Sequence, residues 1–561
     1  MCGLVGNLSN EPAMPILSKI LNKLEMRGYD SYGFVTFLDN GTVEDEIKGL
    51  GPSSTLNIDC LGNFKAKTGM AHTRWSTNGV VSTKNTCPIK VGDWYVCLNG
   101  IIENYKTLKD SLIYYGYSCK TDTDTEVIPC LLDLWCSFSD KGLEYSLQGV
   151  CDALMGEYAF IAMSPKYPDT ILAACHGSPI YISSKGYISS DIQSLQSLDT
   201  VCFKLEDDKP TIITNQTLKE YYYNIEIPKE VDKKVMVGDH MLSEIEEQTN
   251  LKIKDIKLDE HKEIVLFACG SSYYAAKLGQ YYLEEISKVR CSAYYASDLQ
   301  YHNLDLFDED TLFICITQSG ETKDSLLMLD RLKDRNTLVI TNSPQSQATR
   351  LAEQTIFLDC GPELAVASTK TFTASVLTLL HLAEEVNLDE LLGAFKEVLD
   401  QKEKIKEWAN HIKDYEHVLF LARYINFPIA QEAALKLKEV SYIHAEAIQA
   451  AEIKHGPIAL IDDKTLSIFI MGGDNKGGQD KIFNNIEQIK ARNGKVLVIT
   501  NSAWETSVKL HNDDVLVVPT VDKWLQPLVF AVVGQLLAYY CAKLKSLNPN
   551  FPRNLAKTIT V

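Results

Sequence analysis

Cys2 is the first residue of the chain whose type and position suggest chemistry. Its small side chain permits removal of the preceding Met1, which would leave a cysteine with a free α-amine. Such a residue combines a thiol nucleophile with its own proton acceptor, because an α-amine titrates near pH ~8. The alternative is that position 2 tolerates any residue. The position therefore predicts an N-terminal nucleophile only if other segments supply a substrate site.

Four polar segments downstream supply suitable groups: 27–31, 72–79, 98–104 and 123–126. An arginine for a carboxylate and an aspartate for an ammonium group are what a free α-amino acid requires. The Asn-Gly pair at 99–100 ends a strand-like run, where a side-chain amide and a backbone N–H could converge on an oxyanion. Taken singly, Asn-Gly is also a hairpin turn, and Thr-Asp-Thr-Glu is also a helix start.

Three hydroxyl-rich segments in the second half each lie where a predicted helix begins. Segments 267–273 and 316–322 each end a strand and enter a helix, and Val-Ala-Ser-Thr-Lys (366–370) opens another helix. Hydroxyls and free backbone N–H groups at helix N-termini form a ready phosphate site. None of them is a Walker or G-x-G-x-x-G loop, which argues against a nucleotide. Ordinary Ser/Thr helix caps are the alternative, but three in one region favour a sugar phosphate.

Titratable groups gather farther along the chain. Glu432, Lys436 and Glu439 share one face of a predicted helix at 431–440, although a solvated Glu–Lys pair has the same spacing. Segments 443–447 and 452–457 add histidines and carboxylates. The end of the sequence, 552–561, would ordinarily be a frayed tail, yet it is strongly patterned and ends in β-branched residues.

The elements that must position these residues differ between the two halves. Up to about residue 225, short strand-like runs outnumber helical patterns, which predicts a layered α+β domain. The charged, proline-containing stretch after it predicts a linker at 226–241. Beyond it, strands alternate with long helices, and Leu-Val-Ile-Thr-Asn at 338–342 recurs at 497–501. We interpret this as two doubly wound α/β domains, 242–387 and 412–545, with a helical connection at 388–411 and a tail at 546–561.

Composition excludes several classes of protein. The chain has 561 residues, 45% hydrophobic and 23% charged, which is typical of globular domains. Its 55 basic and 74 acidic residues give a net charge of −19, which disfavours nucleic-acid binding. The longest apolar run, 528–542, is too short to span a bilayer, so no membrane association is expected. No Cys-x-x-Cys pair and no zinc-like spacing occurs, and the N-terminus lacks a signal peptide. The chain is predicted to be cytoplasmic.

Taken together, Met-Cys-Gly-Leu-Val-Gly (1–6), Arg-Gly-Tyr-Asp-Ser, His-Thr-Arg-Trp, Asn-Gly-Ile-Ile-Glu-Asn and Thr-Asp-Thr-Glu resemble class II glutamine amidotransferases, and among them the glucosamine-6-phosphate synthase family. The resemblance implies an N-terminal-nucleophile αββα sandwich for residues 1–225, in which Cys2 attacks the side-chain amide of L-glutamine. Asn99 and Gly100 would form the oxyanion hole. The implied glutamine-binding residues are Arg27, Arg74, Trp75, Thr77 and Asp124.

The second half is similar to the two sugar-isomerase (SIS) domains of the same family, and it implies fructose 6-phosphate as the second substrate. In that family's pattern Glu439 moves a proton between C1 and C2, while His455 of a neighbouring subunit opens the sugar ring. Lys557 forms an imine with the C2 ketone, and Lys436 assists. The implied sugar-phosphate-binding residues are Ser271, Thr317, Gln318, Ser319, Thr322, Val366 and Ser368.

The resemblance carries further expectations. It implies an internal ammonia channel, glucosamine 6-phosphate as product, at least a homodimer, and no metal or organic cofactor. Because imine formation needs an unprotonated amine, Lys436 or Lys557 is predicted to lie where desolvation or a cation lowers its pKa. The chain departs from the family at Asn78, Cys87 and Leu98, where histidine occurs in other members.

Two alternatives remain open on the sequence. One is another class II amidotransferase, which the missing Ser-Gly-Gly-x-Asp-Ser loop and the SIS repeat disfavour. The other is a non-catalytic SIS sugar-phosphate sensor, which the complete set of Cys2, Lys436, Glu439, His455 and Lys557 disfavours.

Overall fold

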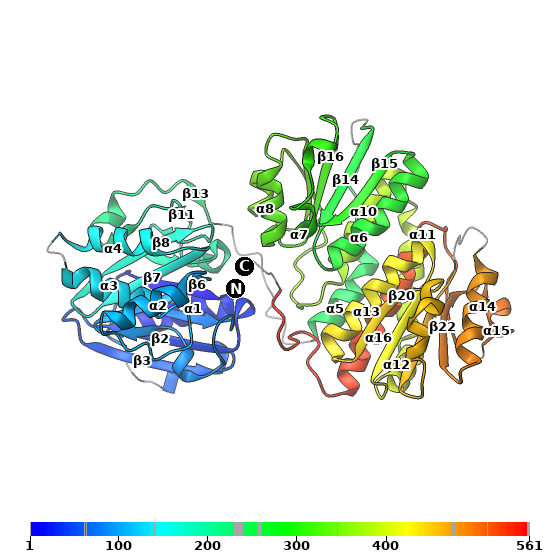
Figure 1. Cartoon of the computed structure of the whole chain (residues 1–561), viewed down its shortest axis with the longest axis horizontal. Coiled ribbons are helices and arrows are strands. Elements are labelled where there is room, and N and C mark those ends of the chain that lie inside the picture. Colours follow the sequence, from blue (N-terminus) through cyan, green and yellow to red (C-terminus); the bar gives the residue numbers. More distant parts are fainter. Residues whose placement is uncertain are drawn as a thin grey trace. The chain divides into compact units, whose positions relative to one another are not determined.

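The computed structural model describes residues 2–60, 62, 64–138, 141–227, 239–254, 261–344, 346–472, 478–512 and 514–557 (Figure 1). The chain divides into two compact units, Met1–Val235 and Met236–Lys557. Most of the predicted linker lies outside the described residues, at 228–238. Met1 and positions 558–561 of the predicted tail also lie outside them.

The first unit contains two antiparallel sheets among its described residues. The larger sheet has the strand order β13-β11-β9-β10-β1-β4-β2-β3, and the smaller has the order β12-β8-β7-β6-β5. The larger consists of β1 (Gly3–Asn7), β2 (Ser31–Phe37), β3 (Val43–Leu50), β4 (Thr68–Arg74), β9 (Tyr181–Ser183), β10 (Tyr187–Ser189), β11 (Val201–Lys204) and β13 (Ile225–Glu226). The smaller consists of β5 (Ile89–Val91), β6 (Trp94–Gly100), β7 (Tyr158–Ser164), β8 (Tyr167–His176) and β12 (Thr211–Thr214).

Successive side chains point to opposite faces of each sheet, and this alternation gives the unit four layers. Leu4 of β1 points into a core shared by both sheets, whereas its neighbour Val5 points into a core beneath α1 (Ala13–Leu24). On the smaller sheet, Cys97 faces the inter-sheet core, and Val96 faces the helices α2 (Tyr105–Tyr114), α3 (Val127–Phe138) and α4 (Leu143–Ala153). The order helix, sheet, sheet, helix confirms the predicted αββα sandwich.

One predicted helix start is displaced. The Thr-Asp-Thr-Glu segment was expected to open a helix, but α3 begins only at Val127. The reason is that the acidic side chains bond elsewhere: Glu126 accepts the backbone N–H groups of Lys120 and Thr121, and Asp124 accepts that of Ile102. The segment is therefore a turn that presents Asp124 rather than the first turn of the helix.

The second unit contains two parallel five-stranded sheets in its described part, with the same topology. Their orders are β15-β14-β16-β17-β18 and β20-β19-β21-β22-β23, which confirms the predicted pair of doubly wound domains. The first sheet consists of β14 (Glu263–Ala268), β15 (Arg290–Tyr295), β16 (Leu312–Thr317), β17 (Thr337–Thr341) and β18 (Gln354–Phe357). The second consists of β19 (His417–Ala422), β20 (His444–Gln449), β21 (Thr465–Ile470), β22 (Lys495–Asn501) and β23 (Val515–Val518).

The helices of this unit cover both sheets and join them through a shared core (Figure 1). Most important for the site are α5 (His240–Glu247), α6 (Ser271–Tyr282), α8 (Lys323–Arg331), α10 (Lys370–Ala383) and α13 (Phe427–Ser441). The other helices are α7 (Ala296–Leu299), α9 (Ala348–Leu351), α11 (Leu388–Asp400), α12 (Lys402–Ile412), α14 (Gln479–Lys490), α15 (Glu505–Lys509) and α16 (Gln526–Leu544).

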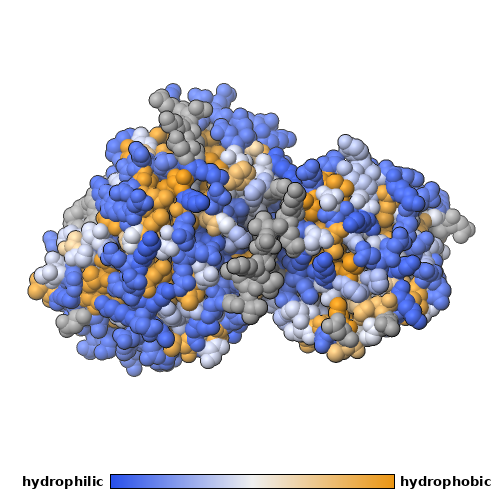
Figure 2. Space-filling view, turned by 180° about the vertical axis from the view of Figure 1, so that it is seen from behind, coloured by the Kyte–Doolittle hydropathy of each residue, from blue (hydrophilic) through white to orange (hydrophobic). Residues whose placement is uncertain are grey.

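The apolar run near the C-terminus forms the central helix of this core. Among the described residues, α16 is the one helix long and apolar enough to cross a membrane, but 83% of its apolar window is buried within the protein. It packs against α12 and α13. The face of the molecule in Figure 2 instead shows hydrophilic residues interspersed with smaller hydrophobic areas.

Candidate active sites

The antiparallel pairing of β1 with β4 positions the candidate nucleophile. Gly3 lies opposite Thr73, so Cys2, the residue before β1, lies near the end of β4. The Trp75 N–H donates to the Cys2 sulfur at 3.3 Å, and the thiol lies 3.6 Å from the Trp75 carbonyl. Burial raises the pKa of the Cys2 thiol, while the Trp75 N–H opposes the shift. The thiol is therefore protonated at neutral pH and needs a proton acceptor when it attacks.

A small cavity of about 20 Å³ collects most of the residues predicted for glutamine. Its open space is enough for about one water molecule. It is lined by Cys2, His72, Arg74, Trp75, Thr77, Asn78, Cys87, Leu98, Gly100, Thr123, Asp124 and Thr125. All three departures from the family pattern, Asn78, Cys87 and Leu98, thus line the same space as the thiol.

The two predicted arginines lie in different surroundings. Arg74 borders the cavity, but its guanidinium donates to the backbone carbonyls of Asn78, Gly79 and Val80 and so ties this loop to the end of β4. Arg27 forms an ion pair with Asp191 at 2.9 Å, and Asp191 caps a short 3-10 helix. The structure therefore gives Arg27 a contact that supports the domain, and only Arg74 borders the thiol.

Burial shifts the pKa values of the carboxyl and imidazole groups that line this cavity. Burial raises the pKa of Asp124, against the hydrogen bonds from Ile102 N–H and from Asn78. Burial also lowers the pKa of His72 to about 4, so its ring is neutral and its Nε2–H donates to the Leu98 carbonyl at 2.9 Å. His72 is absent from the predicted site residues, although it begins the His-Thr-Arg-Trp motif, which was the available signal.

Asn99 and Gly100, the predicted oxyanion pair, lie at the end of β6. Asn99 is fully buried, and neither atom of its amide makes a hydrogen bond of ordinary geometry within the described part of the chain, although His72 lies close. A buried amide without partners is unfavourable unless a ligand completes it. Gly100 has φ of +96°, and an added Cβ would lie 2.1 Å from the Glu157 carbonyl oxygen. Position 100 therefore requires glycine.

The Gly100→Ala variant is expected to lose about 100-fold in glutamine hydrolysis, because the Cβ must displace the backbone, and with it the N–H predicted to bind the oxyanion. Glutamate release measures the effect. Gly116→Ala is a matched control in the same unit: Gly116 has a similar φ of +91°, but an added Cβ meets nothing within 4 Å. Equal losses in both variants would show that backbone strain alone is responsible.

In the second unit, the predicted sugar-phosphate residues lie where strands of the first sheet end. Ser271 begins α6 after β14, and Thr317 ends β16, with its hydroxyl accepting the Gly320 N–H at 3.2 Å. Gln318, Ser319 and Thr322 complete the loop before α8, and Val366 and Ser368 lie before α10. The carboxyl ends of neighbouring parallel strands meet at one edge of a sheet, which is the usual ligand site of this topology.

Lys436 joins these loops to the second sheet's helix α13. Its ammonium group donates to Ser271 Oγ at 3.0 Å and to Glu439 at 2.6 Å, and it pairs with Glu432 at 3.5 Å. The pKa lowering predicted for at least one of Lys436 and Lys557 does not occur at Lys436. Burial does lower the pKa of Lys436, but the carboxylates of Glu432 and Glu439 outweigh it and raise the pKa above its ordinary value. Lys436 is therefore a cation in this site.

Glu432 is a buried carboxyl beside Lys436 that was not among the predicted site residues. Burial raises the pKa of Glu432 from 4.5 to about 7, despite the nearby ammonium of Lys436. Between these two pH values the folded protein holds a proton that the unfolded chain has lost. Stability is therefore expected to fall as the pH rises through this window.

The Glu432→Gln variant removes this titration, so its melting temperature relative to the wild type should be higher at pH ~8 than at pH ~5. Thermal unfolding at both pH values measures the difference. Glu446→Gln, at an exposed position on β20, is the control. If the difference in melting temperature between Glu432→Gln and the wild type did not change with pH, this would contradict the raised pKa of Glu432.

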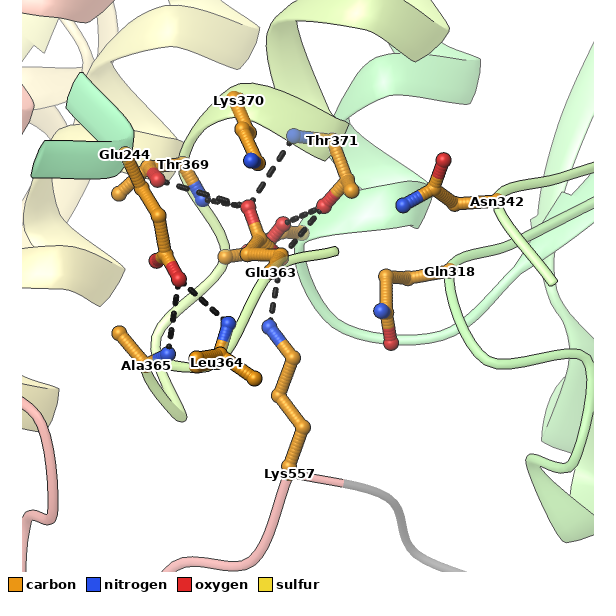
Figure 3. Close-up of polar contacts among 12 residues, drawn as sticks. Glu244, Gln318, Asn342, Glu363, Leu364, Ala365, Thr369, Lys370, Thr371 and Lys557 are labelled. Atoms are coloured by element: carbon orange, nitrogen blue, oxygen red, sulfur yellow. Dashed lines mark hydrogen bonds and ion pairs between the residues drawn. The ribbon is translucent and has the colours of Figure 1, made fainter. Parts of the chain in front are cut away.

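The C-terminal segment is anchored rather than frayed. The Asn550 carbonyl accepts the Val366 N–H at 3.1 Å, and the Arg553 N–H donates to the Tyr442 hydroxyl at 2.6 Å. The Arg553 guanidinium also lies 4.2 Å from the centroid of the Tyr442 ring. These contacts place Lys557 against Glu363, at 2.5 Å (Figure 3).

Glu363 is fully buried and was missed by the sequence analysis. Burial would raise its pKa, but Lys557, the Thr371 hydroxyl and the Thr369 N–H together hold the pKa of Glu363 at about 2. Its position just before the hydroxyl-rich 366–370 segment was the available signal. His455, in contrast, is exposed at the end of a short 3-10 helix, Glu452–His455.

Comparison with known proteins covers the whole chain. A profile described as a glutamine amidotransferase domain matches residues 72–197, and one described as a SIS domain matches 257–384 and 411–544. Glutamine–fructose-6-phosphate aminotransferase (isomerizing) of Chlorobaculum tepidum is 35% identical, with 100% of both chains covered. The protein of the same name from Methanosarcina mazei is 34% identical with the same coverage.

Solved structures agree for the second unit. The C-terminal domain of glucosamine-fructose-6-phosphate aminotransferase from Francisella tularensis has a TM-score of 0.52 and 31% identity, covering 57% of this chain and 100% of that one. Tagatose-6-phosphate ketose/aldose isomerase from Escherichia coli has a TM-score of 0.50 at 16% identity, covering 59% and 99%, and shares the fold. The full-length identity to curated relatives decides the assignment: the chain belongs to the isomerizing glutamine–fructose-6-phosphate aminotransferases, the family of glucosamine-6-phosphate synthases.

Proposed function

We propose that this enzyme hydrolyses L-glutamine at Cys2, passes the ammonia internally to fructose 6-phosphate, and isomerises the product to glucosamine 6-phosphate. The observation that carries the first half is that Cys2, Gly100 and Asp124 line one cavity. A thiol, an oxyanion donor and a carboxylate for an ammonium group are the parts that an amidase acting on a free amino acid requires.

The glutaminase steps follow from these groups. The Cys2 sulfur attacks the amide carbon, the α-amine of the processed chain accepts the thiol proton, and the oxyanion forms between Asn99 and Gly100. The same proton then passes to the leaving nitrogen, which departs as ammonia, and water hydrolyses the thioester to glutamate. The Arg74 guanidinium would exchange its loop carbonyls for the substrate carboxylate, and Trp75 and Thr77 would close over it. Arg27 supports this site through Asp191.

The sugar steps use the second unit. The phosphate would be bound by the hydroxyls and N–H groups of the loops after β14 and β16 and before α10. The Lys557 amine would attack the C2 ketone with loss of water, and ammonia would displace the lysine. Glu439 would then move a proton from C1 to C2. Lys436, held as a cation by two carboxylates, would stabilise negative charge at the sugar oxygens.

Assembly and location complete the proposal. Because His455 is exposed, it is free to enter the site of a second copy, which favours a homodimer. An internal path for ammonia is chemically favoured, since ammonia released to neutral water becomes ammonium and loses its nucleophilicity. We place the enzyme in the cytoplasm.

One assay separates this proposal from its rivals. Purified protein is mixed with glutamine and fructose 6-phosphate, and glutamate and glucosamine 6-phosphate are quantified together. The proposal requires both products in equal amounts. Glutamate without amino sugar would indicate another acceptor, and the absence of both would indicate a non-catalytic sugar-phosphate sensor.

A further inference from the structure

Glu244 of α5 is a buried carboxyl that none of the proposed steps uses. It is 1% exposed and lies under the loop that begins with Glu363 (Figure 3). Its Oε1 accepts the backbone N–H groups of Leu364 and Ala365, the two residues that follow Glu363. Its Oε2 has no hydrogen-bond partner among the described residues. One oxygen thus seats the loop, and the other is available to carry or release a proton.

We propose that Glu244 is a positioning residue for Lys557: the charge on its carboxyl sets how readily the lysine becomes the free amine that attacks the sugar ketone. The inference rests on the proposed function, in which Lys557 forms the imine. It addresses a requirement of the site, because Lys557 pairs with the anionic Glu363, and a neighbouring carboxylate favours the ammonium form of a lysine.

The two carboxyls behave differently around neutral pH. Glu363 is ionised, since Lys557 and its other donors hold its pKa at about 2 against burial. Burial raises the pKa of Glu244 to about 7, and the negative charge of Glu363 adds to the shift, while Lys557 and the two N–H groups oppose it. Glu244 therefore changes charge in the pH range in which the enzyme would work, and Lys557 is one of the charges that it senses.

Several other charged or titratable groups surround Glu244 in the described part of the chain. On its own helix, Glu247 is neutralised by the buried Lys370 of α10 at 2.5 Å. On the loop side, burial raises the pKa of the Cys360 thiol to about 12, so that it stays uncharged. On α16, burial raises the pKa of Tyr539, and Lys543 pairs with Asp239. His240 of α5 lies beside the ring of Phe551, and Lys436 of α13 interacts electrostatically with Glu363.

The expected direction follows from Coulomb's law. When Glu244 is ionised, its charge and that of Glu363 both act on the lysine and favour its ammonium form; when Glu244 is neutral, the charge of Glu363 alone does so. Glutamine at position 244 imitates the neutral state permanently. It also keeps a carbonyl oxygen for the Leu364 and Ala365 N–H groups, so the two hydrogen bonds that hold the loop are preserved.

The test traps the imine chemically in the full-length protein. Wild type, Glu244→Gln and the same-helix control Glu246→Gln are incubated with fructose 6-phosphate and borohydride from about pH 6 to about pH 9. Borohydride donates hydride to the imine carbon, and the resulting stable secondary amine on Lys557 is quantified by mass spectrometry. The yield should rise with pH in the wild type, and in Glu244→Gln the rise should move to lower pH by about one unit. Glu246→Gln should follow the wild type, because Glu246 pairs with Lys402 away from the loop.

A second variant separates charge from shape. Glu244→Asp restores a titratable carboxyl and should return the rise toward the wild-type pH. A rise in Glu244→Gln at the wild-type pH or above, with the adduct present, would overturn this inference alone. An absence of any Lys557 adduct in the wild type at every pH would overturn the imine role in the proposed function and this inference with it.

Discussion

The Lys557→Arg variant is expected to form no measurable glucosamine 6-phosphate while continuing to hydrolyse glutamine. Arginine preserves the positive charge opposite Glu363, so the ion pair that seats the tail survives. A guanidinium stays protonated at any working pH and cannot form the imine. The loss of synthesis is expected to be at least about a thousandfold. Parallel assays of amino sugar and glutamate measure the two activities.

Lys545→Arg is the matched control for this substitution, because Lys545 is an exposed lysine just after α16. It should leave both activities at wild-type level. Loss of both activities in Lys557→Arg, with the melting temperature unchanged, would contradict the division of labour between the two units. Retained amino-sugar synthesis would exclude Lys557 as the imine lysine.

Removing the thiol should have an equally large effect on the other reaction. The Cys2→Ala variant is expected to lose at least about a thousandfold in glutamine hydrolysis, since the oxyanion pair and the binding residues remain but nothing attacks the amide. Glutamine-dependent amino-sugar synthesis should fall with it. Imine formation between Lys557 and fructose 6-phosphate should survive, because it needs no nitrogen from glutamine.

Cys60→Ala removes an exposed thiol from the same unit and serves as the control. It should retain full glutaminase activity. If Cys2→Ala released glutamate at the rate of Cys60→Ala, another nucleophile would have to be sought.

Much of the fold was predictable because both halves carry strong periodic patterns. The apolar run at 94–98 became β6, and the duplicated Leu-Val-Ile-Thr-Asn runs became β17 and β22 at equivalent positions in two sheets of the same order. Such patterns persist because strands buried on both faces need continuous apolar sequence. The start of α3 was misplaced because Glu126 and Asp124 bond to distant backbone groups, which local sequence does not reveal.

The sites were predictable where motif residues adjoin a strand end and not where function depends on long-range pairing. The structure brings Cys2, Arg74, Trp75, Thr77, Gly100 and Asp124 to one cavity. Glu363 and Glu244 belong to none of the motifs in the sequence. Their chemistry arises only because the C-terminal tail and α5 both contact the loop that begins with Glu363. The lowered pKa predicted for at least one of Lys436 and Lys557 is absent at Lys436 for the same reason: sequence shows the desolvating helix face, but not the balance between burial and two carboxylates.

The central claim is that nitrogen released at Cys2 becomes the amino group of the sugar. In the direct measurement, the wild-type enzyme receives [amide-15N]glutamine and fructose 6-phosphate in a large excess of unlabelled ammonium. Mass spectrometry then gives the 15N content of the glucosamine 6-phosphate formed. The account predicts a product that carries nearly all of its nitrogen as 15N. A product whose label matches the bulk ammonium would contradict it.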